Sequence, residues 1–408
     1  MARLVLKYRM VWNVMSTNRI EYIRSDEGTV VNRKTDKDKL NTVNAERLDE
    51  ADYPDTQELE KAKKAKRAKR RRRQQFWDRV CGFFLVTGII CGCAGLTLEY
   101  VLVKGPSENI RDVFVNTMNE SRRFKFIPRI FLTEEEFNEI KKDKNIDTDI
   151  ATNEDLIKLP TDTQQQLTED GKDAYGLVDD DGDGIIYQEI RRGSFAGNMI
   201  VILDPKRVFV GMPDDYGGVG LTLEEMCLKY DAIGGINAGG FKDDGGTGLG
   251  GLPQGLTIVD GYCYNDEAFV VDGFAGFDKN GLLHVGWYTY DDCVEKEIVN
   301  AVSFGPILIS NGVPTDPEYL TSGVNPRTAI GQRADGAVIM LVIDGRQVHS
   351  AGATYQDVVD LMLDYGAVNA CNMDGGSSTV MWYDGQYVNK CSAAYGVSRP
   401  LPTAFLFK

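Results

Sequence analysis

The sequence predicts a mixed α/β fold for the C-terminal part of the chain, and three observations lead to this prediction. A helical pattern over Val358–Leu363 leads into a buried strand at Ala367–Cys371. A second helix-then-strand pattern precedes Asn237. Short strand patterns bounded by Gly, Pro and Asp recur over Ile185–Ile343. Together they indicate a mixed β-sheet with packed helices and long glycine-rich loops.

Capping residues mark the two helices. Thr354 followed by Asp357 opens the later helix, and Gly366 is placed to end it. Thr222 followed by Glu225 is the same capping box for the earlier helix. A separate hairpin is predicted from Asn325–Gly331 to Ala337–Ile343, because an Asp-Gly pair lies between these two runs.

Polar residues follow both strands that these helices precede. Asn237 ends one strand, and Asn372 and Asp374 end the other. We expect the two helix–strand units to bring these side chains to one edge of one sheet, where ligands bind in open α/β folds. The alternative is that Asp374-Gly375-Gly376 is only a tight turn, since glycine adopts positive φ freely.

Charge is distributed unevenly along the 408 residues. Residues 1–79 hold 21 Lys and Arg against 13 Asp and Glu, a net charge of +8. The remaining residues hold 25 against 48, a net charge of −23. A region this acidic repels the phosphate backbone of nucleic acids, so we expect no DNA or RNA partner.

Histidine and cysteine patterns exclude two kinds of site. The only histidines are His284 and His349, which rules out a multi-histidine metal centre. The eight cysteines contain no CxxC pair and no zinc-type spacing. Neither disulfide pairing nor oligomeric state follows from the sequence.

The N-terminal third has the pattern of a membrane anchor. We expect residues 1–75 to be a disordered basic cytoplasmic tail, with ten basic residues in Lys61–Arg73, and residues 76–103 to be a transmembrane helix. Its central run, Val80–Leu98, has no charged residue and as a helix spans roughly 28 Å, the thickness of a bilayer core. Trp77 and Tyr100 flank it as interfacial aromatics. The basic residues before it predict a single-pass protein of the cell membrane with its N-terminus in the cytoplasm.

Residues 104–184 are predicted to be an extracytoplasmic stalk and linker, and residues 185–408 the globular domain. The stalk contains two helical patterns, one over Ser107–Arg122 and one beginning at Thr133. It shows no site chemistry. At its end, Asp179, Asp181 and Asp183 have the spacing of an EF-hand calcium loop, but the glutamate falls one residue short of the twelfth position. We expect a polar turn there and no cofactor, with calcium as the weak alternative.

Five motifs in order resemble the phosphodiester glycosidase family, over about Ile190–Lys408. They are Asn237-Ala-Gly-Gly-Phe241, Phe304-Gly-Pro-Ile-Leu308, Asn325-Pro-Arg-Thr-Ala-Ile-Gly331, Asp344-Gly-Arg346 and Asn372-Met-Asp-Gly-Gly-Ser-Ser378. The resemblance implies an enzyme that hydrolyses the glycosidic bond of sugar-1-phosphodiesters. With the predicted anchor, it implies an extracytoplasmic hydrolase acting on cell-envelope or exopolysaccharide glycans.

The resemblance also implies the site residues. Asp374 is the carboxylate for an oxocarbenium-like transition state, Arg327 a bidentate donor to the phosphate, and Asn237 the third catalytic candidate. Substrate-binding candidates are Asn372, Gly240, Gly375, Gly376, Ser377, Ser378 and Thr379, with Asp344 as an outside candidate. A phosphate leaving group is a weak base, so a shortage of histidine is tolerable.

Two other functions stay open at this point. The chain could be a non-catalytic glycan-binding or assembly factor that has kept the fold. It could also be a transferase that uses the same phosphodiester bond in exopolysaccharide biosynthesis. The sugar, the aglycone and the stereochemical course do not follow from the sequence.

Overall fold

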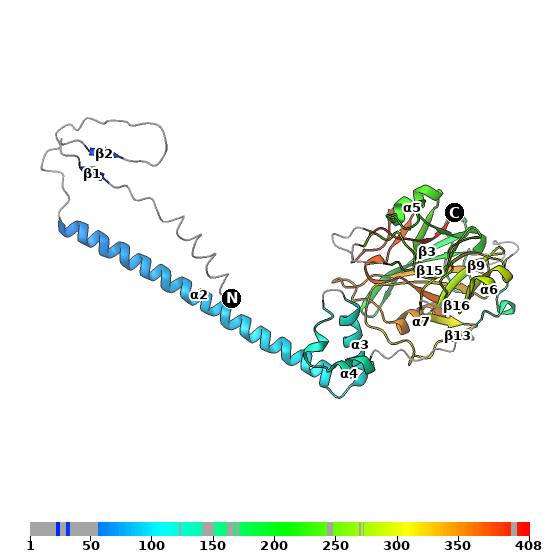
Figure 1. The fold of residues 1–408 in the computed structure, drawn as a ribbon, viewed down its shortest axis with the longest axis horizontal. Coiled ribbons are helices and arrows are strands. Elements are labelled where there is room, and N and C mark those ends of the chain that lie inside the picture. Colours follow the sequence, from blue (N-terminus) through cyan, green and yellow to red (C-terminus); the bar gives the residue numbers. More distant parts are fainter. Residues whose placement is uncertain are drawn as a thin grey trace. The chain divides into compact units, whose positions relative to one another are not determined.

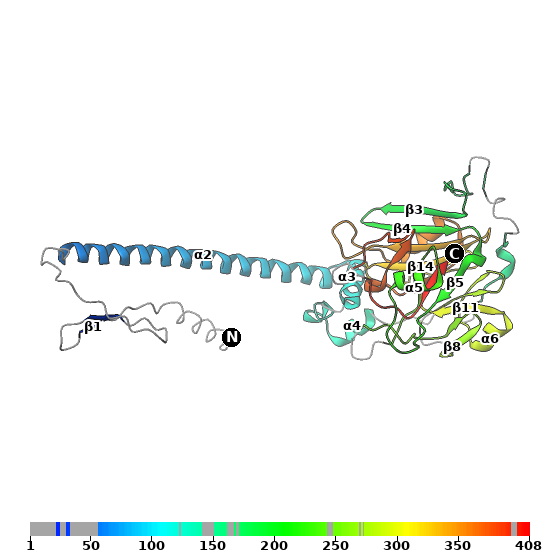
Figure 2. The same ribbon diagram turned by 90° about the horizontal axis from the view of Figure 1, so that it is seen from above.

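A computed structural model describes residues 22–24, 30–32, 56–121, 124–140, 151–160, 167–168, 171–242, 248–268, 271, 273–392 and 398–408. The chain divides into two units, Met1–Gly92 and Cys93–Lys408. Figures 1 and 2 show the chain in two views at right angles. Most of the tail predicted to be disordered lies outside the described residues. Two short strands within it, β1 (Tyr22–Arg24) and β2 (Val30–Asn32), pair antiparallel.

One long helix contains the predicted anchor. Helix α2 runs over Thr56–Lys104, so the basic run Lys61–Arg73 is helical and continuous with the apolar run. This corrects the prediction of disorder up to residue 75. The physical reason is that the run consists of Ala, Lys and Arg, which are all strong helix formers. Over Glu60–Lys104 this helix is long and apolar enough to cross a membrane.

Both helices predicted in the stalk are present. Helix α3 covers Glu108–Glu120 with Ser107 as its N-cap, and α4 covers Glu134–Ile140. A one-turn helix, η2 (Pro128–Ile130), lies between them. Val103, Val115, Leu132 and Phe137 form a small buried cluster that joins these helices to the end of α2.

Three antiparallel sheets form the C-terminal domain. The seven-stranded sheet has the order β13 (Val313–Pro314), β12 (Ile307–Ser310), β16 (Ala367–Met373), β14 (Arg327–Arg333), β15 (Val338–Ile343), β4 (Phe195–Ile202) and β3 (Ile185–Arg192). A five-stranded sheet has the order β18 (Gln386–Tyr387), β17 (Met381–Tyr383), β6 (Gly234–Asn237), β19 (Ala404–Phe407) and β5 (Val208–Gly211). The other has the order β10 (Leu283–Val285), β9 (Phe274–Asp278), β11 (Ile298–Ser303), β7 (Thr257–Val259) and β8 (Tyr262–Asn265).

Helices α5 (Leu223–Tyr230), α6 (Tyr290–Glu295) and α7 (Tyr355–Asp364) lie on the outside of these sheets (Figure 1). Single-turn helices occur at η3 (Glu154–Leu156), η5 (Pro205–Arg207) and η6 (Gly376–Ser378). The predicted class, helices packed with sheets, is confirmed. The described strand pairs are antiparallel, however, whereas a mixed sheet was expected.

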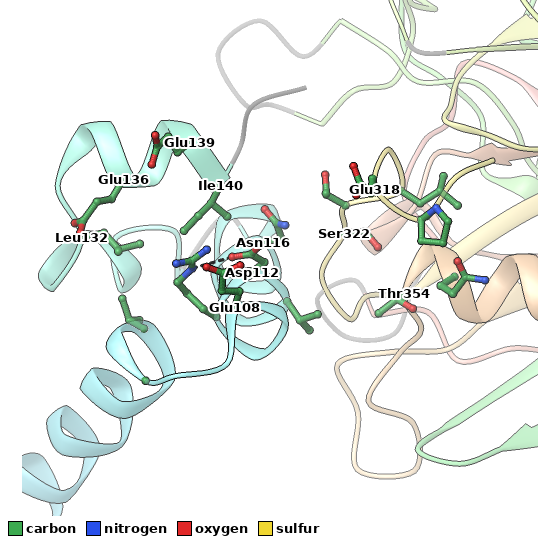
Figure 3. Close-up of a pocket in the computed structure, with 18 of the residues that line it drawn as sticks. Glu108, Asp112, Asn116, Leu132, Glu136, Glu139, Ile140, Glu318, Ser322 and Thr354 are labelled. Carbon is green, nitrogen blue, oxygen red and sulfur yellow. Dashed lines mark hydrogen bonds and ion pairs between the residues drawn. The ribbon is translucent and has the colours of Figure 1, made fainter. Parts of the chain in front are cut away.

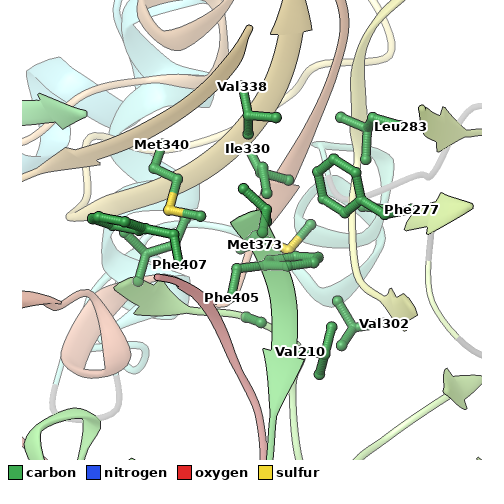
Figure 4. Close-up of a cluster of buried hydrophobic side chains, with 14 of the residues drawn as sticks. Val210, Phe277, Leu283, Val302, Ile330, Val338, Met340, Met373, Phe405 and Phe407 are labelled. Carbon is green, nitrogen blue, oxygen red and sulfur yellow. The ribbon is translucent and has the colours of Figure 1, made fainter. Parts of the chain in front are cut away.

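The main core lies between the seven-stranded sheet and the two smaller ones. Figure 4 shows Met340 of the large sheet beside Phe407, and Ile330 of the same sheet facing Phe405, with Phe277 alongside. Alternate residues of β15 face the opposite side, where Ile339 and its neighbours pack under α7. The strand is therefore buried on both faces, which explains its unbroken apolar sequence.

The local predictions are confirmed in detail. Strands β14 and β15 form the predicted hairpin, with Arg327 opposite Ile343. Thr354 caps α7 in a capping box with Asp357, and Gly366 follows with φ +81°. Thr222 caps α5 in the same way with Glu225.

Two longer-range predictions need correction. Strands β6 and β16 belong to different sheets, so Asn237 and Asp374 do not share one sheet edge. The boundary at residue 185 is also too late. The side chains of Leu167 and Leu177 pack into the domain core, and the carboxylate of Asp173 forms a buried ion pair with Arg333 of β14.

Candidate active site

The ends of β6 and β16 meet although they come from different sheets. The backbone N–H of Asp374 donates to the carbonyl oxygen of Ala238 over 3.0 Å. The amide Nδ2 of Asn237 donates to the carbonyl oxygen of Asp374 over 2.5 Å. Its Oδ1 accepts from the hydroxyl of Thr328 and from the N–H of Val380. Asn237 is buried, and its amide links three chain segments beneath Asp374.

The turn after Asp374 depends on glycine. Gly376 has φ +63°, a left-handed conformation that favours glycine. A Cβ atom on Gly375 would lie 2.9 Å from the carbonyl oxygen of Pro326. The N–H of Gly376 donates to that same oxygen, which holds the turn against the start of β14. The tight turn and the candidate site are therefore the same feature.

A cavity of about 850 Å³ opens beside this turn. The predicted site residues that line it are Arg327, Asn372, Asp374, Gly240, Gly375, Gly376, Ser377 and Ser378. They come from three separate parts of the sequence, and the fold brings them together. Asn237, Thr379 and Asp344 are not among the lining residues, so these three lie behind or beside the cavity.

Arg327 lines the cavity but is heavily engaged with the protein. Its Nε donates to the carbonyl oxygen of Ala353, and its Nη2 donates to that of Gly323 over 2.6 Å. The guanidinium also lies over the ring of Tyr355, 4.1 Å from the ring centroid. Because two of its nitrogens already have protein acceptors, Arg327 does not present the free bidentate fork that phosphate binding was expected to use.

Two further arginines line the cavity and were missed. Nε and Nη2 of Arg346 both donate to Oδ1 of Asn325. Burial lowers the pKa of the Arg346 guanidinium, and the positive charge of Arg327 lowers it further. Arg399 lies over the ring of Phe241 and donates to the hydroxyl of Ser377 over 3.2 Å. Arg346 belongs to the quoted Asp-Gly-Arg motif, which was a usable signal. Arg399 belongs to no motif.

Glu120, at the end of α3, is a second carboxylate on the cavity wall. Its Oε1 accepts from the N–H of Gly323, and its Oε2 accepts from Asn325 and from Nη2 of Arg327. The helix approaches closely because residue 323 is glycine: a Cβ there would lie 2.2 Å from the backbone N of Thr117. The stalk, in which no site residue was expected, therefore contributes a carboxylate to the wall of the candidate cavity.

Asn372 lines the cavity and is held by the backbone around it. Its Nδ2 donates to the carbonyl oxygens of Gly305 and Met373. Its Oδ1 is buried and has no hydrogen-bond partner among the described residues. The neighbouring thiol of Cys371 is no nucleophile, because burial raises its pKa well above the ordinary value.

Asp344 belongs to a separate polar network. One carboxylate oxygen lies 2.8 Å from Nε2 of His349, and the other accepts from Asn389 and from the N–H of Lys390. These contacts hold the loop after β15 against the segment after β18. The arrangement supports a structural role for Asp344.

A larger cavity, about 880 Å³, lies between the stalk helices and the loop before β14 (Figure 3). Five carboxylates line it, against the two cations Lys104 and Arg111: Glu108, Asp112, Glu136, Glu139 and Glu318. An anionic substrate would be repelled there. The cavity beside Asp374 is therefore the better candidate site.

The aspartate cluster before β3 forms a compact loop. Carboxylate oxygens of Asp179, Asp181 and Asp183 lie within 4.8 Å of one another. Each of these side chains accepts a hydrogen bond from a backbone N–H of the same loop, so the turn accounts for the cluster. A polar turn without a cofactor stays the prediction, with calcium as the weak alternative.

Comparison with known proteins confirms the resemblance in the C-terminal region. Residues 230–408 match the model of the phosphodiester glycosidase family. A prophage-derived uncharacterized protein of Bacillus subtilis, YomE, is 31% identical over 183 residues, which are 42% of this chain and 27% of that protein. Human N-acetylglucosamine-1-phosphodiester alpha-N-acetylglucosaminidase is 24% identical over 218 residues, 48% of this chain and 41% of that protein.

Among solved structures, the chain is similar to the zebrafish N-acetylglucosamine-1-phosphodiester alpha-N-acetylglucosaminidase catalytic domain, auto-inhibited by its pro-peptide. The identity is 23% and the TM-score 0.47, covering 55% of this chain and 81% of that one. The chain spans less than half the length of the curated relatives named above. Glu120 and the stalk lie outside the matched region.

Proposed function

Starting from a C-terminal region that matches the phosphodiester glycosidase family, we propose that this protein hydrolyses the bond between a sugar and a phosphodiester. One observation carries the proposal: Asp374 lines the same cavity as three arginines, Arg327, Arg346 and Arg399. A carboxylate beside clustered guanidinium groups suits a substrate with a positive charge developing on the sugar and a negative charge on the phosphate.

Arg346 and Arg399 bind the substrate's phosphate in this proposal, and Arg327 adds positive charge to the cavity wall. Arg346 and Arg399 flank the turn Gly376–Ser378, and the hydroxyl of Ser377 already accepts from Arg399. These groups supply positive charge within a part of the sequence that is strongly acidic. Guanidinium groups match phosphate oxygens in geometry and stay charged at any working pH.

Asp374 acts on the sugar. As the C1–oxygen bond to phosphate breaks, its carboxylate stabilises the oxocarbenium-like transition state. The phosphate departs as a weak base, so no strong general acid is needed. Water then adds its oxygen to C1, giving free sugar and a phosphomonoester. Asn372 also lines the cavity, and a sugar hydroxyl or acetamido N–H that reached its buried Oδ1 would give that atom the partner it lacks among the described residues.

The test uses the full chain and the methyl diesters of several α-sugar 1-phosphates, with free sugar and methyl phosphate measured. Asp374→Asn should lower kcat by about 100-fold or more, the usual scale for a catalytic carboxylate. Asp384→Asn is the matched control, because Asp384 is exposed in a turn outside the cavity, and Asn tolerates its φ of +48°. Equal rates for both variants would reject this role for Asp374. Binding of the diesters without any product would favour the glycan-binding alternative.

The proposed location is the outer side of the cell membrane, with cell-envelope or exopolysaccharide glycans as substrates. The apolar part of α2 follows ten basic residues in Lys61–Arg73, which favours a cytoplasmic N-terminus. Protease added to intact cells should then remove the C-terminal domain and leave an N-terminal tag protected. Protection of both ends would contradict this topology.

A further inference from the structure

An apolar cavity of about 730 Å³ adjoins the candidate active site. One wall is α3, with Ile110, Val113, Phe114 and Met118. The other wall is the domain, with Val324 and Ala351. This volume falls within the roughly 300–1,000 Å³ of small-molecule sites, and apolar linings are usual there.

The two cavities share part of their walls. Ser121, Phe124 and Arg346 line both of them. The result is one groove, with Asp374 and the arginines at its polar end and hydrocarbon walls at its apolar end. Arg346 lies at the junction, where its guanidinium is held by Asn325 Oδ1. A ligand that fills the whole groove has an anion beside Arg346 and an apolar chain attached to that anion.

The apolar end is open to solvent in this structure. Ile110 is 55% exposed and Phe124 is 49% exposed, although both line the groove. Exposed apolar side chains around a concave surface mark a binding site for an apolar partner. Helix α3 also begins only four residues after α2 ends, and α2 is long and apolar enough to cross a membrane. The apolar wall is thus joined by a short link to the segment predicted to lie in the bilayer.

We propose that this groove binds a hydrocarbon aglycone, so that the substrate is a sugar linked through a phosphodiester to a lipid. This inference rests on the proposed hydrolase function. Water adds its oxygen to C1 of the sugar, and the bond from C1 to the phosphate oxygen breaks. The sugar leaves with a free hydroxyl, and the lipid keeps the phosphate as a monoester.

The experiment compares methyl and octyl diesters of α-N-acetylglucosamine 1-phosphate on the full chain in phosphatidylcholine nanodiscs. Each methylene buried in the groove should raise kcat/KM by about fourfold. Burial of about four of the seven additional carbons would therefore make kcat/KM for the octyl diester exceed that for the methyl diester by at least about 100-fold. Met118→Gln and Ala351→Phe should reduce this ratio about tenfold or more, the first by making the wall polar and the second by filling the groove. Leu228→Gln is the matched control, because Leu228 is 73% exposed on α5 and lines neither cavity.

The outcomes separate the two proposals. No hydrolysis of either diester would reject the hydrolase function itself. Equal kcat/KM for the two diesters would overturn the lipid inference and leave the hydrolase intact. An octyl preference that survives in both groove variants would show partition into the bilayer instead of binding in the groove, and would also overturn it. Unfolding temperatures of the variants check that each is folded.

Discussion

Glu120 should weaken the binding of an anionic substrate. Its carboxylate lies on the wall of the candidate site, where it accepts from Gly323, Asn325 and Arg327. The replacement Glu120→Ala removes this negative charge and frees the Nη2 atom of Arg327 from one of its two acceptors. The cavity is open to water, so the released donors do not stay unpaired.

The size of the effect follows from the charges that line the cavity. Three arginines and the two carboxylates of Glu120 and Asp374 give a net charge of +1, and the variant raises it to +2. For a phosphate about 7 Å from Glu120 and an effective dielectric constant of about 20, one charge contributes roughly 2 kcal/mol. Glu120 is 32% exposed, so screening by solvent reduces this to about 1 kcal/mol, or roughly a fivefold change in affinity.

The assay measures KM and kcat for a methyl sugar-1-phosphodiester at low and high salt. We expect Glu120→Ala to lower KM about fivefold at low salt and less at high salt. Asp384→Asn removes one exposed negative charge that is not part of the cavity lining and should leave KM within experimental error. A KM that rises in Glu120→Ala would refute the electrostatic reasoning and show that Glu120 helps to hold the substrate.

Three further predictions concern stability. Burial lowers the pKa of His284, and the nearby Lys296 lowers it further. The unfolded chain therefore binds a proton that the folded chain excludes, so the free energy of unfolding should fall as the pH drops below about 6.5. His284→Phe should flatten this decrease in a denaturation series. Asp173→Ala removes an ion-pair partner from the fully buried Arg333 and should lower the free energy of unfolding, measured in urea, by about 3 kcal/mol. The exposed ion pair Lys279–Glu297 should contribute less than about 1 kcal/mol to the same quantity. Chelation by EDTA should leave the melting temperature of the protein unchanged, because the carboxylates of Asp179 and Asp183 already accept hydrogen bonds from backbone N–H groups. A fall of several degrees would establish a bound cation.

Local patterns in the sequence predicted local structure well. The capping box of Thr354 and Asp357 and the Asp-Gly turn between β14 and β15 involve residues close in sequence. Their geometry depends on backbone conformation and short hydrogen bonds, which residue type largely determines. The turn at Gly375–Gly376, which the sequence offered as the alternative to a functional site, is local in the same way.

Long-range partners were harder to predict. Strand β6 pairs with β19 near the C-terminus and with β17, and nothing within its four residues specifies these neighbours. Glu120 lies about 200 residues before Arg327 and outside the region that matches the family. Because an isolated glutamate at a helix end has an ordinary solvent-exposed role in most sequences, only the folded arrangement reveals its place in the cavity.

Asn237 should position Asp374 although it does not line the cavity. Its buried amide donates to the carbonyl oxygen of Asp374 and accepts from Thr328 and Val380. Asn237→Leu keeps the volume but removes three hydrogen bonds, and should cost about 3 kcal/mol of stability, near 1 kcal/mol for each bond. Because the backbone of Asp374 loses its support, kcat should fall more than tenfold while KM changes little.

Thr328→Val is the matched variant. It removes only the hydrogen bond from Thr328 to the Asn237 amide oxygen, so it should cost about 1 kcal/mol of stability and leave kcat nearly unchanged. Equal losses of kcat in the two variants would show that the amide acts through general stability, and that the bond to Asp374 has no special part in catalysis.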